Sequence, residues 1–172
     1  MSYIPLFKLL PEVAEKETRS LTLLVGNPFD LPPDEYGLIE LYCGDRNCDC
    51  RRVFFNVVSR NKKRTMATAS FGWESKDFYA SWVSRGRIKT YNELDKDDQL
   101  AVDDLCGFHL NLPSEQSELA PNILKMIEDL LEADEDYYER ILRHYKIFRA
   151  KIDGKDKGKS IENDFRSCKH ED

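Results

Sequence analysis

Three of the five cysteines in this chain of 172 residues fall within one short segment. Cys43, Cys48 and Cys50 follow one another with four residues and then one residue between them, and two apolar runs flank them at 38–42 and 53–58. Both runs are rich in β-branched or aromatic residues and are short enough to be strands. The segment therefore predicts a loop between two paired strands that brings three thiols close together.

Three thiols in one loop favour a metal site. The N-terminal segment lacks the charged and apolar regions of a signal peptide, which predicts a cytoplasmic protein with reduced thiols. Zinc takes four ligands, and thiolate sulfur and imidazole nitrogen are the usual donors. The spacing of the cysteines differs from the paired Cys-x2-Cys knuckle of many zinc sites. The alternative to a metal site is a loop of reduced thiols that binds no metal. We expect structural Zn²⁺ held by Cys43, Cys48 and Cys50, with Arg46, Arg51 and Arg52 offsetting its thiolate charge.

A fourth ligand has to come from a distant part of the chain. His144 is the first candidate, because its spacing from Ile141 and Phe148 places it beside the apolar stripe of a predicted helix. The alternative for His144 is a histidine at the edge of the core, bonded to a backbone carbonyl. Cys106 and His109 form a second pair of candidates, and Cys168 and His170 a third, near the end of the chain.

The rest of the sequence predicts an α+β domain over residues 1–150. Runs at 21–25, 38–42, 53–58 and 65–71 favour an antiparallel meander of three or four strands. Shorter helices are expected after Ser75, ending at 85–87, and over 95–105. Two helices from Pro121 onward carry apolar residues at helical spacing and should pack as a hairpin on the sheet. Residues 151–172 are charged, contain glycine and lack apolar spacing, which predicts a flexible tail.

Several segments together resemble a group of uncharacterised prokaryotic proteins. They are YCGD at 42–45, CDCRRV at 48–53, SFGWES at 70–75, QSELAP at 116–121 and RHYKIFR at 143–149. Some proteins similar to this group carry a C-terminal SEC-C zinc motif after the position that matches Arg149. This chain lacks that motif and has Cys168 and His170 in its place. The resemblance supports a metal and a role for His144, but it implies no activity.

Charge and motifs argue against several classes of function. The net charge of −6 disfavours a protein that coats nucleic acid, and no apolar run is long enough to span a membrane. The sequence has no zinc-protease, serine-hydrolase, phosphate-loop or zinc-deaminase signature, so we predict no catalytic residue and no organic cofactor. The leading hypothesis is therefore a zinc-stabilised interaction module for an unknown protein partner.

Two alternatives remain open. The cations between Arg51 and Arg64 could form a basic hairpin that binds nucleic acid. The three cysteines could also be the only protein ligands of a metalloenzyme, with an exchangeable fourth position.

Overall fold

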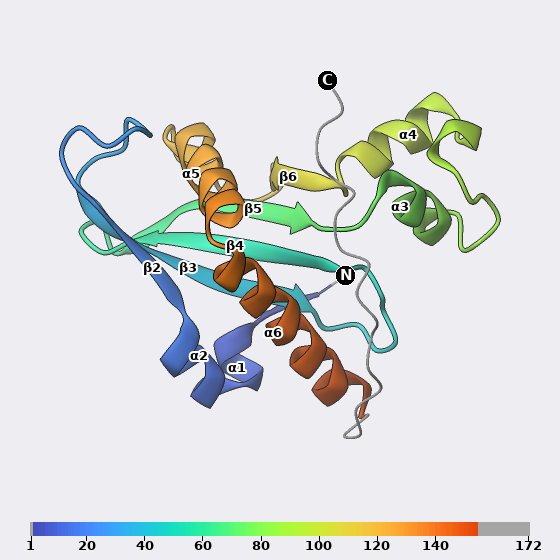
Figure 1. The fold of residues 1–172 in the computed structure, drawn as a ribbon, viewed down its shortest axis with the longest axis horizontal. Coiled ribbons are helices and arrows are strands. Elements are labelled where there is room, and N and C mark those ends of the chain that lie inside the picture. The colour runs from blue at the N-terminus through green and yellow to red at the C-terminus, as the bar shows by residue number, and fades with distance from the viewer. Residues whose placement is uncertain (1, 155–172) are drawn as a thin grey trace.

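The computed structural model describes residues 2–154 and confirms the α+β class. Its centre is an antiparallel sheet of six strands (Figure 1). The hydrogen-bonded order is β1-β3-β4-β5-β6, and β2 also pairs with β3. The strands are β1 (Tyr3–Pro5), β2 (Arg19–Leu23), β3 (Asp34–Cys43), β4 (Arg52–Ser59), β5 (Arg64–Gly72) and β6 (Gly107–Leu110).

The expected meander forms the middle of this sheet as β3, β4 and β5, and short strands extend it on both sides. At one edge, β2 pairs with the first half of β3 and β1 with its last residues, so the two short strands lie end to end along one partner. At the other edge, β6 pairs with the end of β5. The sequence did not predict β1 or β6, because strands of three and four residues are too short to show alternation.

Proline or a side-chain cap marks the start of four of the helices. Pro11 occupies the first turn of α2, where its missing N–H is tolerated, and the side chains of Ser75, Asp95 and Asp134 cap α3, α4 and α6 by accepting a backbone N–H. A 3₁₀ helix spans Tyr91–Glu93. The α-helices are α1 (Leu6–Leu9), α2 (Pro11–Glu17), α3 (Lys76–Val83), α4 (Lys96–Asp103), α5 (Ala120–Ala133) and α6 (Glu135–Asp153).

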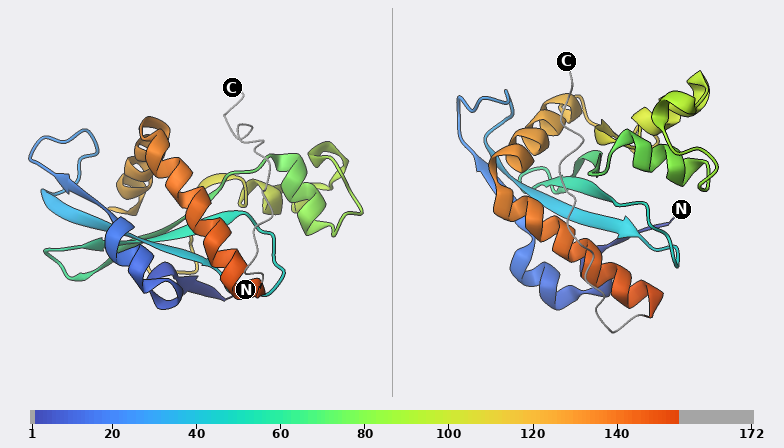
Figure 2. Two further views of the ribbon diagram at one scale, coloured as in Figure 1. Left: turned by 60° about the horizontal axis from the view of Figure 1, so that its bottom comes forward. Right: turned by 45° about the vertical axis from the view of Figure 1, so that its right-hand side comes forward.

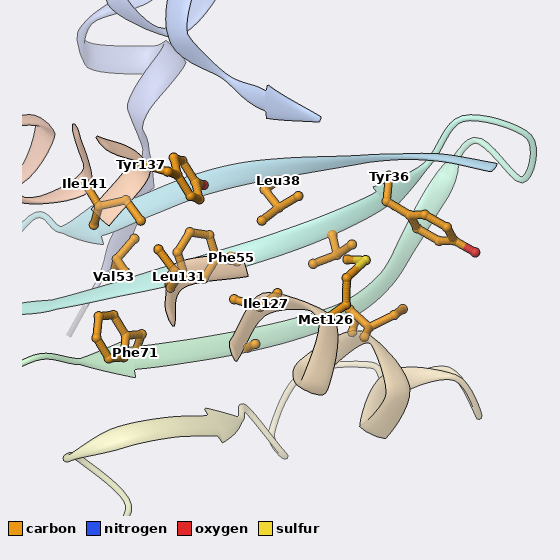
Figure 3. Close-up of a cluster of buried hydrophobic side chains, with 14 of the residues drawn as sticks. Tyr36, Leu38, Val53, Phe55, Phe71, Met126, Ile127, Leu131, Tyr137 and Ile141 are labelled. Carbon is orange, nitrogen blue, oxygen red and sulfur yellow. The ribbon is translucent and has the colours of Figure 1, made fainter. Parts of the chain in front are cut away.

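The main core lies between the sheet and the two C-terminal helices. Figures 1 and 2 show α5 and α6 crossing the sheet one after the other, with the chain changing direction between them. Alternate residues of β4, among them Val53, Phe55 and Val57, are fully buried on the covered face. They pack with α5 and α6 residues that include Ile127 and Ile141 (Figure 3).

A smaller cluster packs α3 against α4 beyond the end of β5 (Figure 1). Its buried members are Tyr79, Ala80, Leu94 and Val102. Gly72 joins this cluster to the sheet, because a Cβ atom there would lie 2.0 Å from the carbonyl oxygen of Leu105. The close approach of the two backbones therefore requires glycine.

The structured part of the chain continues past the boundary expected at residue 150. Helix α6 runs to Asp153, and Gly154 ends it in the left-handed conformation that favours glycine. Lys151 Nζ donates to the carbonyl oxygen of Leu9, so this last turn packs against the rest of the domain. The remainder of the expected tail, 155–172, lies outside the described residues.

Candidate metal centre

The cysteine loop connects the end of β3 to the start of β4. Cys43 is the last residue of β3, and the loop returns to the sheet at Arg52. Asn47 and Arg51 have positive φ angles of 57° and 45°, which let the chain reverse over a short distance. The backbone N–H of Gly44 donates to the carbonyl oxygen of Ser2 at 2.7 Å, so the residue just before β1 holds the start of the loop.

This loop brings the three predicted cysteines together. The sulfur atoms of Cys43, Cys48 and Cys50 all lie within 4.8 Å of one another. A tetrahedral zinc with Zn–S bonds of about 2.3 Å needs sulfurs about 3.8 Å apart, so small side-chain movements would complete such a site. Cys43 and Cys50 are buried and Cys48 is half-buried, so solvent reaches the group most easily from the side of Cys48. The donor set fits a thiophilic metal ion such as zinc.

The thiols differ in their affinity for protons. A hydrogen bond from the Cys50 thiol, aided by the backbone N–H of Asp45, lowers the pKa of Cys43 to about 6. The same contact raises the pKa of Cys50, and burial raises the pKa of Cys48. At neutral pH the metal-free group therefore holds one thiolate and two thiols, and three-thiolate ligation would release two protons.

Helix α6 holds the loop through three side chains. The guanidinium of Arg149, which is mostly buried, donates to the carbonyl oxygens of Cys43 and Asp45 at 2.8 and 3.0 Å. The Asp153 carboxylate accepts the backbone N–H of Asn47 at 2.8 Å and also bonds Arg149. Tyr145 donates to the Asp49 carboxylate at 3.2 Å. Hydrogen bonds from α6 side chains to loop atoms therefore join the cysteine loop to the helical layer.

Helix α3 and the segment before it hold the other side of the loop. Arg51 forms ion pairs with Asp49 at 3.0 Å and with Glu74 at 2.8 Å, and its guanidinium lies 4.5 Å from the ring centroid of Phe78. The Tyr79 hydroxyl donates to the carbonyl oxygen of Arg51 at 2.9 Å. The loop is thus fastened to α6 and to the α3–α4 cluster at once.

Two of the three arginines near the cysteines, Arg51 and Arg52, bond to oxygen atoms. Arg51 pairs with carboxylates, and Arg52 donates to the Ser70 hydroxyl at 3.0 Å and to the Asp104 carbonyl at 3.2 Å. Arg46 is exposed. Arg149 was not among the residues predicted from the sequence, yet its buried guanidinium donates to the carbonyl oxygen of Cys43. Its position on the apolar side of α6, one residue after Phe148, was the available signal.

His144 is fully buried, as its position on the helix predicts, but its ring faces carboxylates. Nδ1 lies 2.7 Å from Glu40 Oε2 and Nε2 lies 3.1 Å from Glu17 Oε2. Alternation along β3 explains this arrangement. Tyr42 points toward α6 and bonds the Ile141 carbonyl, so Cys43, the next residue, faces the other side of the sheet. The His144 ring is therefore placed with Glu40 and Glu17, and the group that could hold a metal contains the three cysteines alone.

The other candidate ligands also lie apart from the cysteine group. Cys106 Sγ is 3.3 Å from the carbonyl oxygen of Glu74, and His109 Nε2 is 2.7 Å from the carbonyl oxygen of Cys106. Neither belongs to the group of three, which is the one potential metal-binding group among residues 2–154. Cys168 and His170 lie outside the described residues.

The basic stretch between Arg51 and Arg64 divides into two groups. Arg51 and Arg52 stand at the cysteine end of β4, whereas residues 60–64 form the turn at its other end. Eight residues of extended strand separate the groups by roughly 25 Å. Arg51 and Arg60 are in ion pairs, with Glu74 and Glu35 respectively. The cations therefore do not form one continuous patch on the described surface.

Comparisons with known proteins give no relative: no family model, curated protein or solved structure matches this chain. Within residues 2–154, no helix combines the length and apolar character that crossing a lipid bilayer requires.

Proposed function

We propose that Cys43, Cys48 and Cys50 bind a zinc ion that stabilises this domain, and that the domain serves as a non-catalytic interaction module. The proximity of the three sulfurs, within 4.8 Å, is the observation that carries the proposal. Thiolate is the ligand type that structural zinc sites use most, and a site assembled only in the folded chain converts metal-binding energy into folding energy.

The position of the loop explains why a metal would matter to the whole domain. Side chains from α6 and α3 bond to loop atoms, so disorder in the loop would weaken both contacts. Arg149 and Asp153 bond the loop from one side, and Tyr79 from the other. A metal that fixes the sulfurs would therefore stabilise the seam between the main core and the α3–α4 cluster.

Metal content and stability test this proposal together. Protein purified without added metal should contain one zinc per chain, and chelation should lower its melting temperature. Cys50→Ser should lose the metal and show the same fall without chelator. Cys106→Ser removes a disulfide-bonded cysteine outside the group and should retain zinc, so it serves as the control for metal content. Near-zero metal in fresh protein, together with three freely alkylated thiols, would refute the proposal.

A second candidate is a metal site with an exchangeable fourth position. The described residues bring three ligands together rather than four, and the half-buried Cys48 leaves one side of the group more accessible. Open positions of this kind are typical of catalytic zinc. X-ray absorption of the zinc-loaded protein distinguishes the two sites. A fourth protein ligand supports the structural site. An oxygen ligand supports the exchangeable site if added cyanide or thiol replaces it.

The proposed partner is another protein. Leu24 and Val25 stand next to each other in the connection between β2 and β3 with 72% and 87% of their surface exposed, and they are the contact surface proposed for that partner. A photo-crosslinker placed at Val25 should capture a specific protein in cells, whereas one placed at the exposed Lys96 should not. Equal labelling from both positions would argue against this surface.

A further inference from the structure

A turn inside the cysteine loop brings two of its sulfurs back toward each other. The backbone N–H of Cys48 donates to the carbonyl oxygen of Asp45 at 3.3 Å, so the chain reverses just after the end of β3. Cys43 is the last residue of that strand, and its sulfur lies within 4.8 Å of both other sulfurs. The three thiols of the loop are free in the structure. They are therefore close enough to react with one another as well as to share a metal.

Accessibility and chain geometry favour one of the three possible disulfides. Cys48 is half-buried, whereas Cys43 and Cys50 are buried, so a small oxidant from solvent reaches the Cys48 sulfur first. One residue separates Cys48 from Cys50, and a bond between neighbours this close in the chain would be strained. Four residues separate Cys43 from Cys48, and they already fold back in a turn. The favoured pair is therefore Cys43 with Cys48.

Disulfide formation and metal binding would exclude each other. A tetrahedral zinc ion holds its sulfurs about 3.8 Å apart, whereas the two sulfurs of a disulfide are about 2 Å apart and no longer carry thiolate charge. Once Cys43 and Cys48 are joined, Cys50 is the one remaining thiol of the group. A single thiolate is too few for a structural zinc site, so oxidation of the pair would release the metal.

We infer that this loop is a redox-sensitive switch, in which hydrogen peroxide joins Cys43 and Cys48 in a disulfide and thereby expels the metal. The Cys48 sulfur attacks one peroxide oxygen, the O–O bond breaks, and a sulfenic acid and one water form. The Cys43 sulfur then attacks the Cys48 sulfur, the S–O bond breaks, and a second water leaves. Peroxide takes up the two electrons and the two thiol protons, and zinc-bound thiolates draw those protons from solvent instead.

The contacts of the loop extend the effect of oxidation to the rest of the domain. Arg149 bonds the Cys43 carbonyl from α6, and Tyr79 bonds the Arg51 carbonyl from α3, so the loop joins the main core to the α3–α4 cluster. The stability of this seam would then depend on the redox state of the loop. The metal-release step rests on the zinc site proposed above, whereas disulfide formation requires the thiols alone.

Peroxide treatment of the full-length protein tests this inference. Zinc-loaded and zinc-free protein are exposed to hydrogen peroxide, a chelating dye reports released zinc, and the remaining thiols are alkylated for mass spectrometry. Trypsin cleaves after Arg46 and Arg51, so Cys43 falls in one peptide and Cys48 and Cys50 in the next. We expect these peptides to be linked through Cys43 and Cys48, with Cys50 alkylated and one zinc released per disulfide. A dithiol reductant with added zinc should reverse both changes.

Two variants separate the redox step from metal binding. Cys50→Ser removes a metal ligand but keeps the reacting pair, so it should form the Cys43–Cys48 disulfide as fast as the zinc-free native protein does. Cys48→Ser lacks the accessible sulfur and should react with peroxide at least about tenfold more slowly. A disulfide in Cys50→Ser, together with native protein that never binds zinc, would refute the structural zinc site and still support the redox reaction.

Several results would overturn the inference. Peroxide could leave Cys43 and Cys48 reduced in zinc-free protein, or oxidise them beyond sulfenic acid without joining them. A disulfide between Cys48 and Cys50, or a Cys48→Ser variant that reacts as fast as the native protein, would contradict the assigned pair. Zinc that stays bound after the Cys43–Cys48 disulfide has formed would contradict the expulsion step.

Discussion

Arg149 Nη1, on helix α6, donates to the carbonyl oxygen of Cys43 at 2.8 Å, joining positions 106 residues apart in the chain. The same guanidinium bonds the Asp45 carbonyl and the Asp153 carboxylate, so one buried cation satisfies three acceptors. Charge-assisted hydrogen bonds of this kind are among the stronger polar contacts in proteins. The geometry of the cysteine loop consequently depends on α6 even before a metal binds.

Replacing Arg149 should loosen the cysteine loop. Arg149→Met keeps most of the side-chain volume but leaves the carbonyl of Cys43 without its donor, which should lower the free energy of unfolding by about 2–3 kcal/mol. Zinc should also exchange faster from this variant. Denaturant unfolding and the rate of zinc transfer to a chelating dye measure the two effects. Arg143→Met, at an exposed position on the same helix, should change both far less.

Zinc affinity should rise with pH. With the pKa of Cys43 lowered to about 6 and the pKa values of Cys48 and Cys50 raised, two protons must leave when zinc binds at neutral pH. The logarithm of the apparent affinity should therefore increase by about two per pH unit above pH 6 and by about three below it. Competition with a chelator of known affinity across pH 5.5–8 gives the slope, and a slope near zero would contradict three-thiolate ligation.

His144 should contribute to stability through its carboxylate partners. His144→Phe leaves the buried Glu40 carboxylate without its nitrogen partner at 2.7 Å, and breaking such a buried pair typically costs roughly 3–5 kcal/mol. Adding Glu40→Gln should recover part of this loss in a double-mutant cycle. One zinc per chain should remain bound to the folded His144→Phe protein. Loss of an imidazole signal from its X-ray absorption spectrum would instead identify His144 as the fourth ligand.

Gly72 should not tolerate a side chain. The added methyl group of Gly72→Ala would meet the Leu105 carbonyl at 2.0 Å and the Tyr79 hydroxyl at 2.6 Å, so β5 and the α3–α4 cluster would have to separate. We expect a loss of about 3 kcal/mol or more, at the upper end of overpacking effects. Gly37→Ala, on β3, has open space around the new methyl group and should be close to neutral. Thermal unfolding of the two variants provides the comparison.

Local pattern was enough to find the main elements of this fold. The alternating, β-branched runs correspond to β3, β4 and β5, and the helical spacing of Ile123, Ile127 and Leu131 corresponds to the buried stripe of α5. These features are visible in sequence because each depends on residues close together in the chain. The three cysteines were found for the same reason, since a single loop carries all of them.

The partners of those residues were decided by the tertiary structure. Sequence spacing placed His144 inside the domain, but the pleat of β3 turns Glu40 and Tyr42 toward α6 and Cys43 away from it, so the imidazole is bonded to carboxylates. Arg149 contacts the cysteine loop because α6 crosses the sheet at that point. Periodicity in a sequence determines which side of an element is buried, whereas the register and crossing of distant elements determine which atoms meet there.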